Sequence, residues 1–195
     1  MGSRRLGRKR LLSLEKRGQV VQKSELGMGV GMSDTFVRAN KMRDGVFNVV
    51  EIVLDLGTSA AAIASFAAND VIGVDGADGT IFTWNESLFG YLVDLEMLVL
   101  ETPTTGDDDL HIYCNNAAVN ANAAGSGNTN TGVDITECLK GKSNSQAVDG
   151  SSVGQTNDHF YIVSDGAATG TYGAGKLLIR ATGFAIDDAA ADTLV

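Results

Sequence analysis

The chain has 195 residues, a formal net charge of −9, 24 glycines, one proline and two cysteines. This length fits one domain with appendages, and glycines scattered without a period exclude collagen and argue against simple disorder. An acidic protein repels nucleic acid and anionic membranes, so any contact with phosphate must run through a locally basic segment.

Such a segment opens the chain. Residues 1–25 hold eight basic and two acidic residues, a net charge of +6, whereas the other 170 residues hold seven basic and 22 acidic ones, a net charge of −15. A block of like charge at one end is typical of an interaction arm. Leucines at irregular spacing predict a short helix over 6–17, which needs a partner surface to be stable. The side chains expected to bind that partner are Arg4, Arg5, Arg8, Lys9, Arg10, Leu11, Leu12, Leu14, Lys16 and Arg17.

The arm is not expected to direct secretion, because its apolar LLSL run is too short for a signal peptide. No apolar stretch approaches the roughly 20 residues that span a bilayer. No contact with a membrane is therefore expected.

Residues 26–45 include the glycine-rich LGMGVGMSD and are expected to be a linker. A body of strands is then predicted over 46–187. Its first strand, VFNVVEIVLDLG, alternates with period two and places four apolar side chains on one face. These are Val50, Ile52, Leu54 and Leu56.

Further strands are predicted in AIASFAANDVIGVDG, GTIFTWN, FGYLVDLEMLVLETP and DLHIYC. The third of these is the longest apolar run, and Pro103 is expected to end it. Its core face is predicted to comprise Tyr91, Val93, Leu95, Met97 and Val99.

The composition changes over 115–158 to small and polar residues, which predicts a long polar loop region that is functional or mobile. Strand character resumes in HFYIVSDG and in KLLIRATGFAI, where Leu177, Ile179 and Ala181 share a face. Residues 188–195 form an acidic tail. About eight strands with little helix predict an all-β sandwich, with a jelly roll as the favoured form and another Greek-key sandwich as the alternative.

Two glycine motifs resemble phosphate-binding loops. GTYGAGKLL fits G-x-x-x-x-G-K, but leucine follows the lysine and the next residues alternate like a strand. VLDLGTS matches the apolar-Asp-x-Gly-Thr turn of actin-like ATPases, a fold that needs a second such turn and a longer chain. Both are interpreted as turns next to strands.

The remaining polar candidates are interpreted as structural. Asp107, Asp108 and Asp109 could bind calcium together with Asp134 or Asp158, but a solvated acidic turn is favoured. His111 and His159 are assigned packing or surface roles, since neither has a recognisable nucleophile beside it. Cys114 and Cys138 are expected to be reduced, partly buried thiols. We therefore expect no enzyme, no cofactor and no metal centre.

Four stretches, MGSRRLGRKRLLSLEKRGQ, EIVLDLGTS, DLHIYC and GAGKLLIRATGFAI, together resemble small structural proteins of tailed bacteriophages of marine bacteria. The resemblance covers both ends and the central strands. It implies a virion component, and it implies no role for individual residues.

The combination favours a capsid decoration or cement protein. Its β body would sit on the shell as a trimer or dimer, and its arm would lie along acidic grooves of the major capsid protein or of a neighbouring subunit. The basic side chains would make charge-assisted hydrogen bonds to carboxylates, and the leucines would insert as apolar anchors. Such an arm orders only when it is bound.

Two alternatives stay open. One is a single jelly-roll coat protein whose arm contacts the packaged genome, and only the arm could contact nucleic acid. The other is a tail, fibre or connector protein. In each case the protein is expected in the virion, after synthesis in the host cytoplasm.

Overall fold

The structure is a computed structural model that describes residues 19–21, 26–32, 36–44, 47–57, 62–124, 129–148 and 157–184. The helix expected over 6–17 and the acidic tail expected over 188–195 lie outside the described residues.

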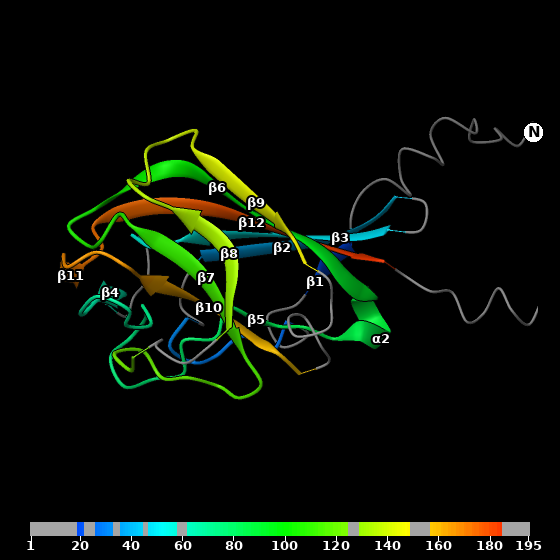
Figure 1. Cartoon of the computed structure of the whole chain (residues 1–195), viewed down its shortest axis with the longest axis horizontal. Coiled ribbons are helices and arrows are strands. Elements are labelled where there is room, and N and C mark those ends of the chain that lie inside the picture. The colour runs from blue at the N-terminus through cyan, green and yellow to red at the C-terminus, as the bar shows by residue number, and fades with distance from the viewer. Residues whose placement is uncertain are drawn as a thin grey trace, which may run out of the picture.

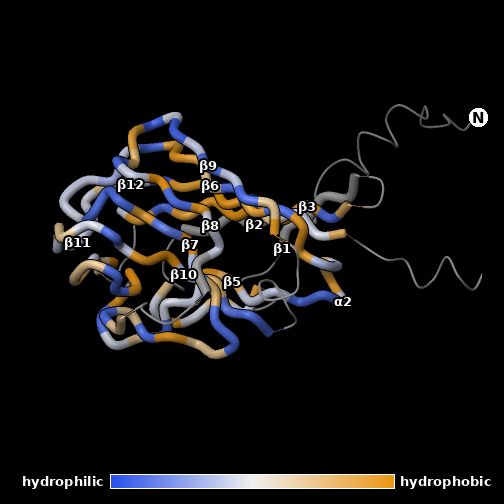
Figure 2. Tube along the Cα trace, in the orientation of Figure 1, coloured by the Kyte–Doolittle hydropathy of each residue, from blue (hydrophilic) through white to orange (hydrophobic). Residues whose placement is uncertain are grey.

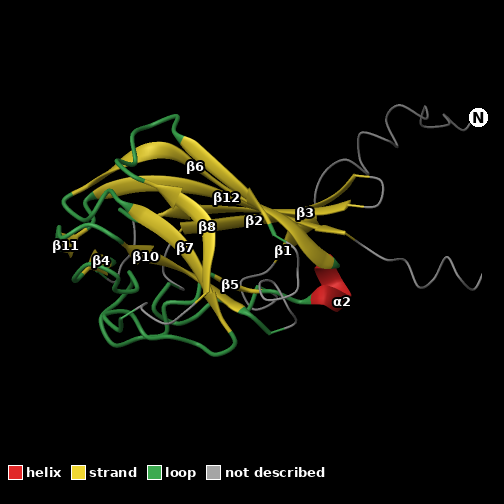
Figure 3. Cartoon of the chain, viewed as in Figure 1, coloured by secondary structure: helices red, strands yellow, loops and turns green. Residues whose placement is uncertain are grey.

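Two antiparallel sheets face each other and enclose one core (Figure 1 and Figure 3). The larger sheet has the order β1-β2-β3-β12-β6-β9, and the smaller has the order β5-β10-β7-β8. The strands of the larger sheet are β1 (Gln19–Val21), β2 (Phe36–Asp44), β3 (Phe47–Asp55), β6 (Tyr91–Thr104), β9 (Ser143–Ala147) and β12 (Ala174–Phe184). The strands of the smaller sheet are β5 (Phe82–Thr83), β7 (Leu110–Asn115), β8 (Thr129–Ile135) and β10 (His159–Ser164). A short pair, β4 (Ala64–Ser65) with β11 (Gly170–Thr171), and a short helix, α2 (Glu86–Phe89), complete the described elements.

The strand order is that of a jelly roll. If β3, β5, β6, β7, β8, β9, β10 and β12 are numbered one to eight, the two sheets have the orders 1-8-3-6 and 2-7-4-5. Eight antiparallel strands interleaved in this way between two sheets form two Greek keys. The predicted all-β jelly roll is therefore confirmed, and β1 and β2 extend the larger sheet beyond β3.

The period-two pattern explains the core. The predicted inner faces of β3 and β12 are confirmed, because Val50, Ile52, Leu54 and Leu56, and Leu177, Ile179 and Ala181, are buried. Apolar positions line both sheets in Figure 2. Across the core, the smaller sheet contributes Phe82, Leu110, Ile112, Cys114, Val133, Phe160 and Ile162.

The predicted core face of β6 is partly wrong. Leu95, Met97 and Val99 are buried as expected, but Leu92 is buried while Tyr91 is exposed. The register between β6 and β12 shifts between Thr182 and Gly183. β6 has one extra residue here, Val93, so the side chains before it, Tyr91 and Leu92, lie on the faces opposite to those predicted.

The predicted linker over 26–45 is also wrong, because it contains β2 and two buried side chains, Leu26 and Met32. Its glycines are contact points: the N–H of Gly29 donates to the Thr80 carbonyl at 2.9 Å, and that of Gly31 to the Asp78 carbonyl at 2.7 Å. A Cβ on Gly29 would lie 2.5 Å from the Asp78 carbonyl oxygen. The glycines thus permit close backbone approach instead of flexibility.

Two regions differ from their predicted secondary structure: 62–76 was predicted to form strands and contains little strand, and 115–158 was predicted to be a loop region and contains two strands. AIASFAANDVIGVDG forms only β4 and isolated bridges. Its backbone runs beside β10, where the N–H of Ile72 donates to the Ile162 carbonyl at 3.0 Å, and Val71 packs with Tyr161 and Val163. The predicted polar loop region instead contains β8 and β9. β9 is largely exposed at the edge of its sheet, so its sequence, SNSQA, has no apolar face to reveal it.

Candidate functional site

The side chains predicted to bind a partner lie outside the described residues. These are Arg4, Arg5, Arg8, Lys9, Arg10, Leu11, Leu12, Leu14, Lys16 and Arg17. The arm was predicted to extend to residue 25, but β1 lies within that range and pairs with β2.

An aromatic row crosses the outer face of the larger sheet at one end. Phe47, Phe184 and Tyr91 are direct cross-strand partners on β3, β12 and β6. They are 41%, 37% and 49% exposed, and the rings of Phe47 and Phe184 meet edge to face at 5.8 Å. Leu88, on the neighbouring helix α2, is 45% exposed. Exposed apolar side chains that gather at one place mark an interaction site more often than scattered ones do.

The strand that follows the arm points toward the same end. In the paired register, Gln19 lies opposite Lys41 and Val21 lies opposite Ala39, while Asp44 lies opposite Phe47. The N-terminal end of β1 is therefore directed toward the end of the sheet that holds the aromatic row. Since Lys41 lies opposite Val50, Gln19 is two strands away from β3 and three register positions short of Phe47.

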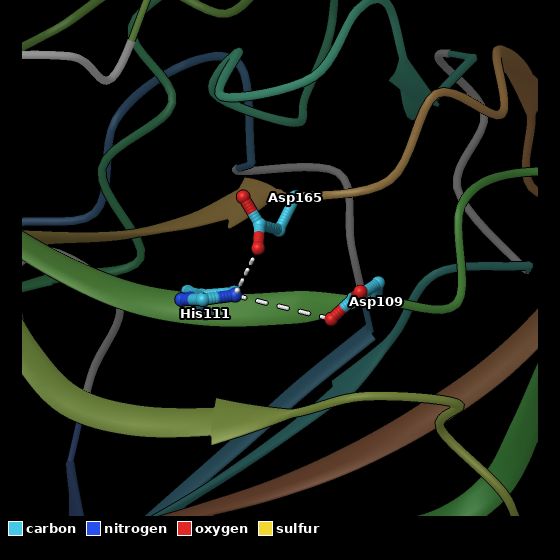
Figure 4. Close-up of side chains that lie close together, drawn as sticks. All are labelled: Asp109, His111 and Asp165. Carbon is cyan, nitrogen blue, oxygen red and sulfur yellow. Dashed lines mark ion pairs between the residues drawn. The ribbon is translucent and has the colours of Figure 1, made fainter.

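A second cluster comprises Asp109, His111, Asp134 and Asp165, and we call it the acid–histidine cluster (Figure 4 shows three of its members). His111 lies on β7, directly opposite Asp134 on β8 and Val163 on β10. Residues two apart on a strand share a face. Asp109 precedes His111 by two positions and Asp165 follows Val163 by two, so the register gathers all four around one imidazole.

His111 Nε2 lies 3.1 Å from Asp165 Oδ2, 3.2 Å from Asp134 Oδ1 and 3.9 Å from Asp109 Oδ1. The histidine is only 8% exposed. Neither of its ring nitrogens has a hydrogen bond to any described residue, and the same is true of the buried Asp109 Oδ1 and Asp134 Oδ1. The carboxylates therefore lie within ion-pair distance of Nε2, but none of these contacts has the geometry of a hydrogen bond.

Backbone hydrogen bonds hold the loops of the cluster in place. The N–H of Asp165 donates to the Asp109 carbonyl at 2.9 Å, which fixes the spacing of these two aspartates. Beside them the buried Asp107 accepts through Oδ1 from the N–H of Asp109, and its carbonyl accepts from the Tyr172 hydroxyl at 2.8 Å. Asp107 is thus part of the scaffold and not a solvated turn residue.

Burial and mutual repulsion act on the carboxylates. The pKa of Asp109 is raised, first by burial and then by the negative charges of Asp134 and Asp165, while His111 opposes the shift. Burial also raises the pKa of Asp107, against hydrogen bonds from backbone N–H groups. A cation within the cluster would relieve this repulsion.

The sequence interpretation identified part of this cluster. It grouped Asp109 with Asp134 as a calcium candidate but favoured a solvated turn, and it omitted His111 and Asp165. Asp158, the other proposed calcium ligand, lies just before the opposite end of β10. His159 has the packing role predicted for it, with Nδ1 3.2 Å from Thr80 Oγ1. The feature of the sequence that indicates this cluster is the Asp-x-His pattern of Asp109 and His111 at the start of β7.

One residue from each of the two glycine motifs that resemble phosphate-binding loops takes part in an ion pair, Lys176 with Asp55. Lys176 lies within β12, and its Nζ is 3.0 Å from Asp55 Oδ2 and 2.8 Å from Glu101 Oε2. Asp55 belongs to VLDLGTS, and its side chain is 7% exposed. This lysine and this aspartate therefore bind each other across neighbouring strands, as their interpretation as structural residues predicts.

Both cysteines are buried, and no disulfide joins Cys114 to Cys138. Burial raises the pKa of the Cys138 thiol to about 12, helped by the charges of Asp108 and Asp109. We expect Cys138 to stay protonated and unreactive toward iodoacetamide from pH 7 to 9 in the folded protein, because the thiolate is the nucleophile. Mass spectrometry of the alkylated peptide measures this, with urea-unfolded protein as the reactive control. Rapid labelling of the folded protein would contradict the burial of this thiol.

Comparisons with known proteins give little guidance. No family model and no curated protein matches the chain. Among solved structures, an RmlC-like cupin from Shewanella frigidimarina NCIMB 400 is similar to this chain, and the alignment covers 89% of this chain and 97% of the cupin chain. The identity is 11% and the TM-score 0.27, so the assignment of the jelly roll depends on the strand order alone. Among the described residues, no helix is long and apolar enough to cross a membrane.

Proposed function

We propose that this chain is a structural, non-enzymatic virion protein that attaches to the capsid shell of a tailed phage and stabilises it. The observation that carries the proposal is the exposed aromatic row at the end of the larger sheet toward which the N-terminal end of β1 points. An exposed aromatic row on a rigid sandwich, together with a basic segment in the sequence, fits a protein that docks on a neighbour. The sequence resemblance to phage structural proteins supports the same assignment.

The body and the arm have complementary roles in this proposal. Beyond the aromatic row, the outer face of the larger sheet carries both ion pairs and half-buried apolar side chains. Arg180 is held between Glu51 and Glu96, and Leu178 lies opposite Val53 and Leu98. The charged side chains help to keep the body from associating unspecifically. Phe47, Phe184 and Tyr91 would be buried against a subunit of the shell, and the arm would extend along acidic grooves of that subunit or the next.

The assay is co-sedimentation of the full chain with purified shells of the phage's major capsid protein. We expect Phe47→Ser with Phe184→Ser to weaken attachment by about tenfold or more, since central aromatic anchors dominate interface energy. Arg4→Glu, Arg5→Glu and Arg8→Glu together should also abolish attachment, because they place acids against an acidic groove.

Both variants should keep the melting temperature of the body close to that of the wild type. The matched control is Leu139→Ser, since Leu139 is 50% exposed but lies outside the aromatic row. If the double phenylalanine variant and the triple arginine variant both attached to shells as well as the wild type does, the proposal would be refuted. Closed particles formed by the chain alone would favour a coat protein instead.

A further inference from the structure

We infer that Asp109, His111, Asp134 and Asp165 form a binding site for a divalent transition-metal ion, with Zn²⁺ as the representative ion. The inference is independent of the proposed function, since it concerns the smaller sheet and not the aromatic row. The site would lie on the outer face of that sheet, where it joins β7, β8 and the segment after β10.

The unsatisfied imidazole is the first reason. His111 is almost fully buried, and its Nε2 points among three carboxylate oxygens without making a hydrogen bond to any residue the structure describes. The carboxylates are within ion-pair distance of Nε2, but a buried polar atom whose hydrogen bond is not made costs about 1–3 kcal/mol. A metal ion at this point would accept the Nε2 lone pair and bind the carboxylate oxygens, and so would satisfy all of these atoms together.

The spacing of the donor atoms is the second reason. Ligand atoms that are each about 2.0–2.1 Å from a metal ion lie about 3.3 Å apart in a tetrahedral site and about 2.9 Å apart in an octahedral one. The distances from His111 Nε2 to Asp165 Oδ2 and Asp134 Oδ1 are 3.1 and 3.2 Å, and one ligand atom from each of Asp109, His111 and Asp165 lies within 4.8 Å of the others. A small rotation of Asp109, whose Oδ1 is 3.9 Å from the ring nitrogen, would close the set.

The donor types select the ion. Calcium and magnesium prefer oxygen ligands throughout, whereas an imidazole nitrogen with carboxylates suits zinc and its neighbours in the transition series. The ion can enter from solvent, because the side chains of Asp134 and Asp165 are 40% and 46% exposed. The calcium site considered from the sequence is therefore replaced by a nitrogen-containing site with a different membership.

Four protein ligands define a closed, structural type of site. Its members come from two strands, β7 and β8, and from the segments before β7 and after β10, with up to 56 positions in sequence between them, from Asp109 to Asp165. An ion bound only by the folded arrangement stabilises the fold by mass action. We therefore expect zinc to act as a staple across the outer face of the smaller sheet.

The test uses the full-length chain, treated with EDTA and then exchanged into chelator-free buffer. Titration calorimetry with ZnCl₂ should show one ion per chain with a micromolar or tighter dissociation constant, and zinc should raise the melting temperature. Asp165→Asn should weaken zinc binding by about tenfold or more and remove most of the rise in melting temperature. The matched control, Asp108→Asn, changes an exposed aspartate of the same loop outside the cluster and should bind zinc like the wild type.

Co²⁺ provides an independent readout. Its visible absorption should change on binding to the wild-type chain and to Asp108→Asn, and should be lost in His111→Gln, because the imidazole nitrogen is then absent. If His111→Gln fails to fold by circular dichroism, the partly exposed Asp165→Asn variant serves in its place. Zinc binding no tighter than millimolar, equal binding by Asp165→Asn, or equal stabilisation by Ca²⁺ would each overturn the assignment.

Discussion

Gly183→Ala is expected to lower the free energy of unfolding by about 3 kcal/mol, because the added methyl group has no space between β12 and the end of α2. A Cβ at this position would overlap the carbonyl oxygen of Phe89 and would lie 2.9 Å from Trp84 Cζ2. The same carbonyl accepts a hydrogen bond from the buried Asn48 side chain at 3.3 Å, so it is not free to move away. Urea denaturation followed by tryptophan fluorescence measures the change.

Gly173→Ala is the matched control. Its new Cβ would meet only the hydroxyl oxygens of Thr104 and Thr105, at 3.3 and 3.4 Å, and side-chain rotation relieves such contacts. We expect this variant to lose less than about 1 kcal/mol. Equal effects of the two substitutions would mean that the close approach of α2 to β12 is not a real constraint.

Phe160→Ala is expected to lower the free energy of unfolding by about 3–5 kcal/mol. Phe160 is fully buried in β10, and its ring stacks on that of Phe82 with centroids 4.4 Å apart and planes 6° apart. The substitution removes this contact and leaves a cavity between the two sheets. Because a domain of this kind has about 5–15 kcal/mol of stability in total, a large share would be lost.

The comparison is Phe47→Ala, which removes an equally large ring from the exposed aromatic row. It should cost about 1 kcal/mol or less, since Phe47 is 41% exposed and loses mainly its edge-to-face contact with Phe184. Denaturation midpoints of the two variants measured side by side test the prediction. A similar loss for both would show that the aromatic row is part of the folding core and not a surface reserved for a partner.

The parts of the fold that the sequence could predict were those set by local alternation. Val50, Ile52 and Leu54 repeat with period two, and the burial of one sheet face enforces that period. The jelly roll followed from the number and length of such segments. The irregularity opposite Thr182 and Gly183, where β6 has one extra residue, exposes Tyr91 and buries Leu92, and the alternation of apolar residues in YLVDLE does not indicate it.

Composition was misleading where glycine or polar residues had a tertiary role. LGMGVGMSD was interpreted as a linker although Gly29 and Gly31 make backbone contacts with the 78–80 segment. β9 was interpreted as loop because an exposed edge strand needs no apolar face.

The acid–histidine cluster could be predicted only in part. Asp109 and His111 share a face two positions apart, which the sequence displays. The approach of Asp134 and Asp165 depends on which strands flank β7 and in which register, and one chain's local pattern does not contain that information. The aromatic row has the same origin, since Phe47, Tyr91 and Phe184 become neighbours only through strand order.

An electron cryomicroscopy map of the phage capsid would test the central claim most directly. The account predicts the jelly-roll body on the outside of the shell lattice, with Phe47, Tyr91 and Phe184 against a shell subunit and density for the arm on a neighbouring subunit. A lattice built by the jelly roll itself, or a capsid without this protein, would contradict the account.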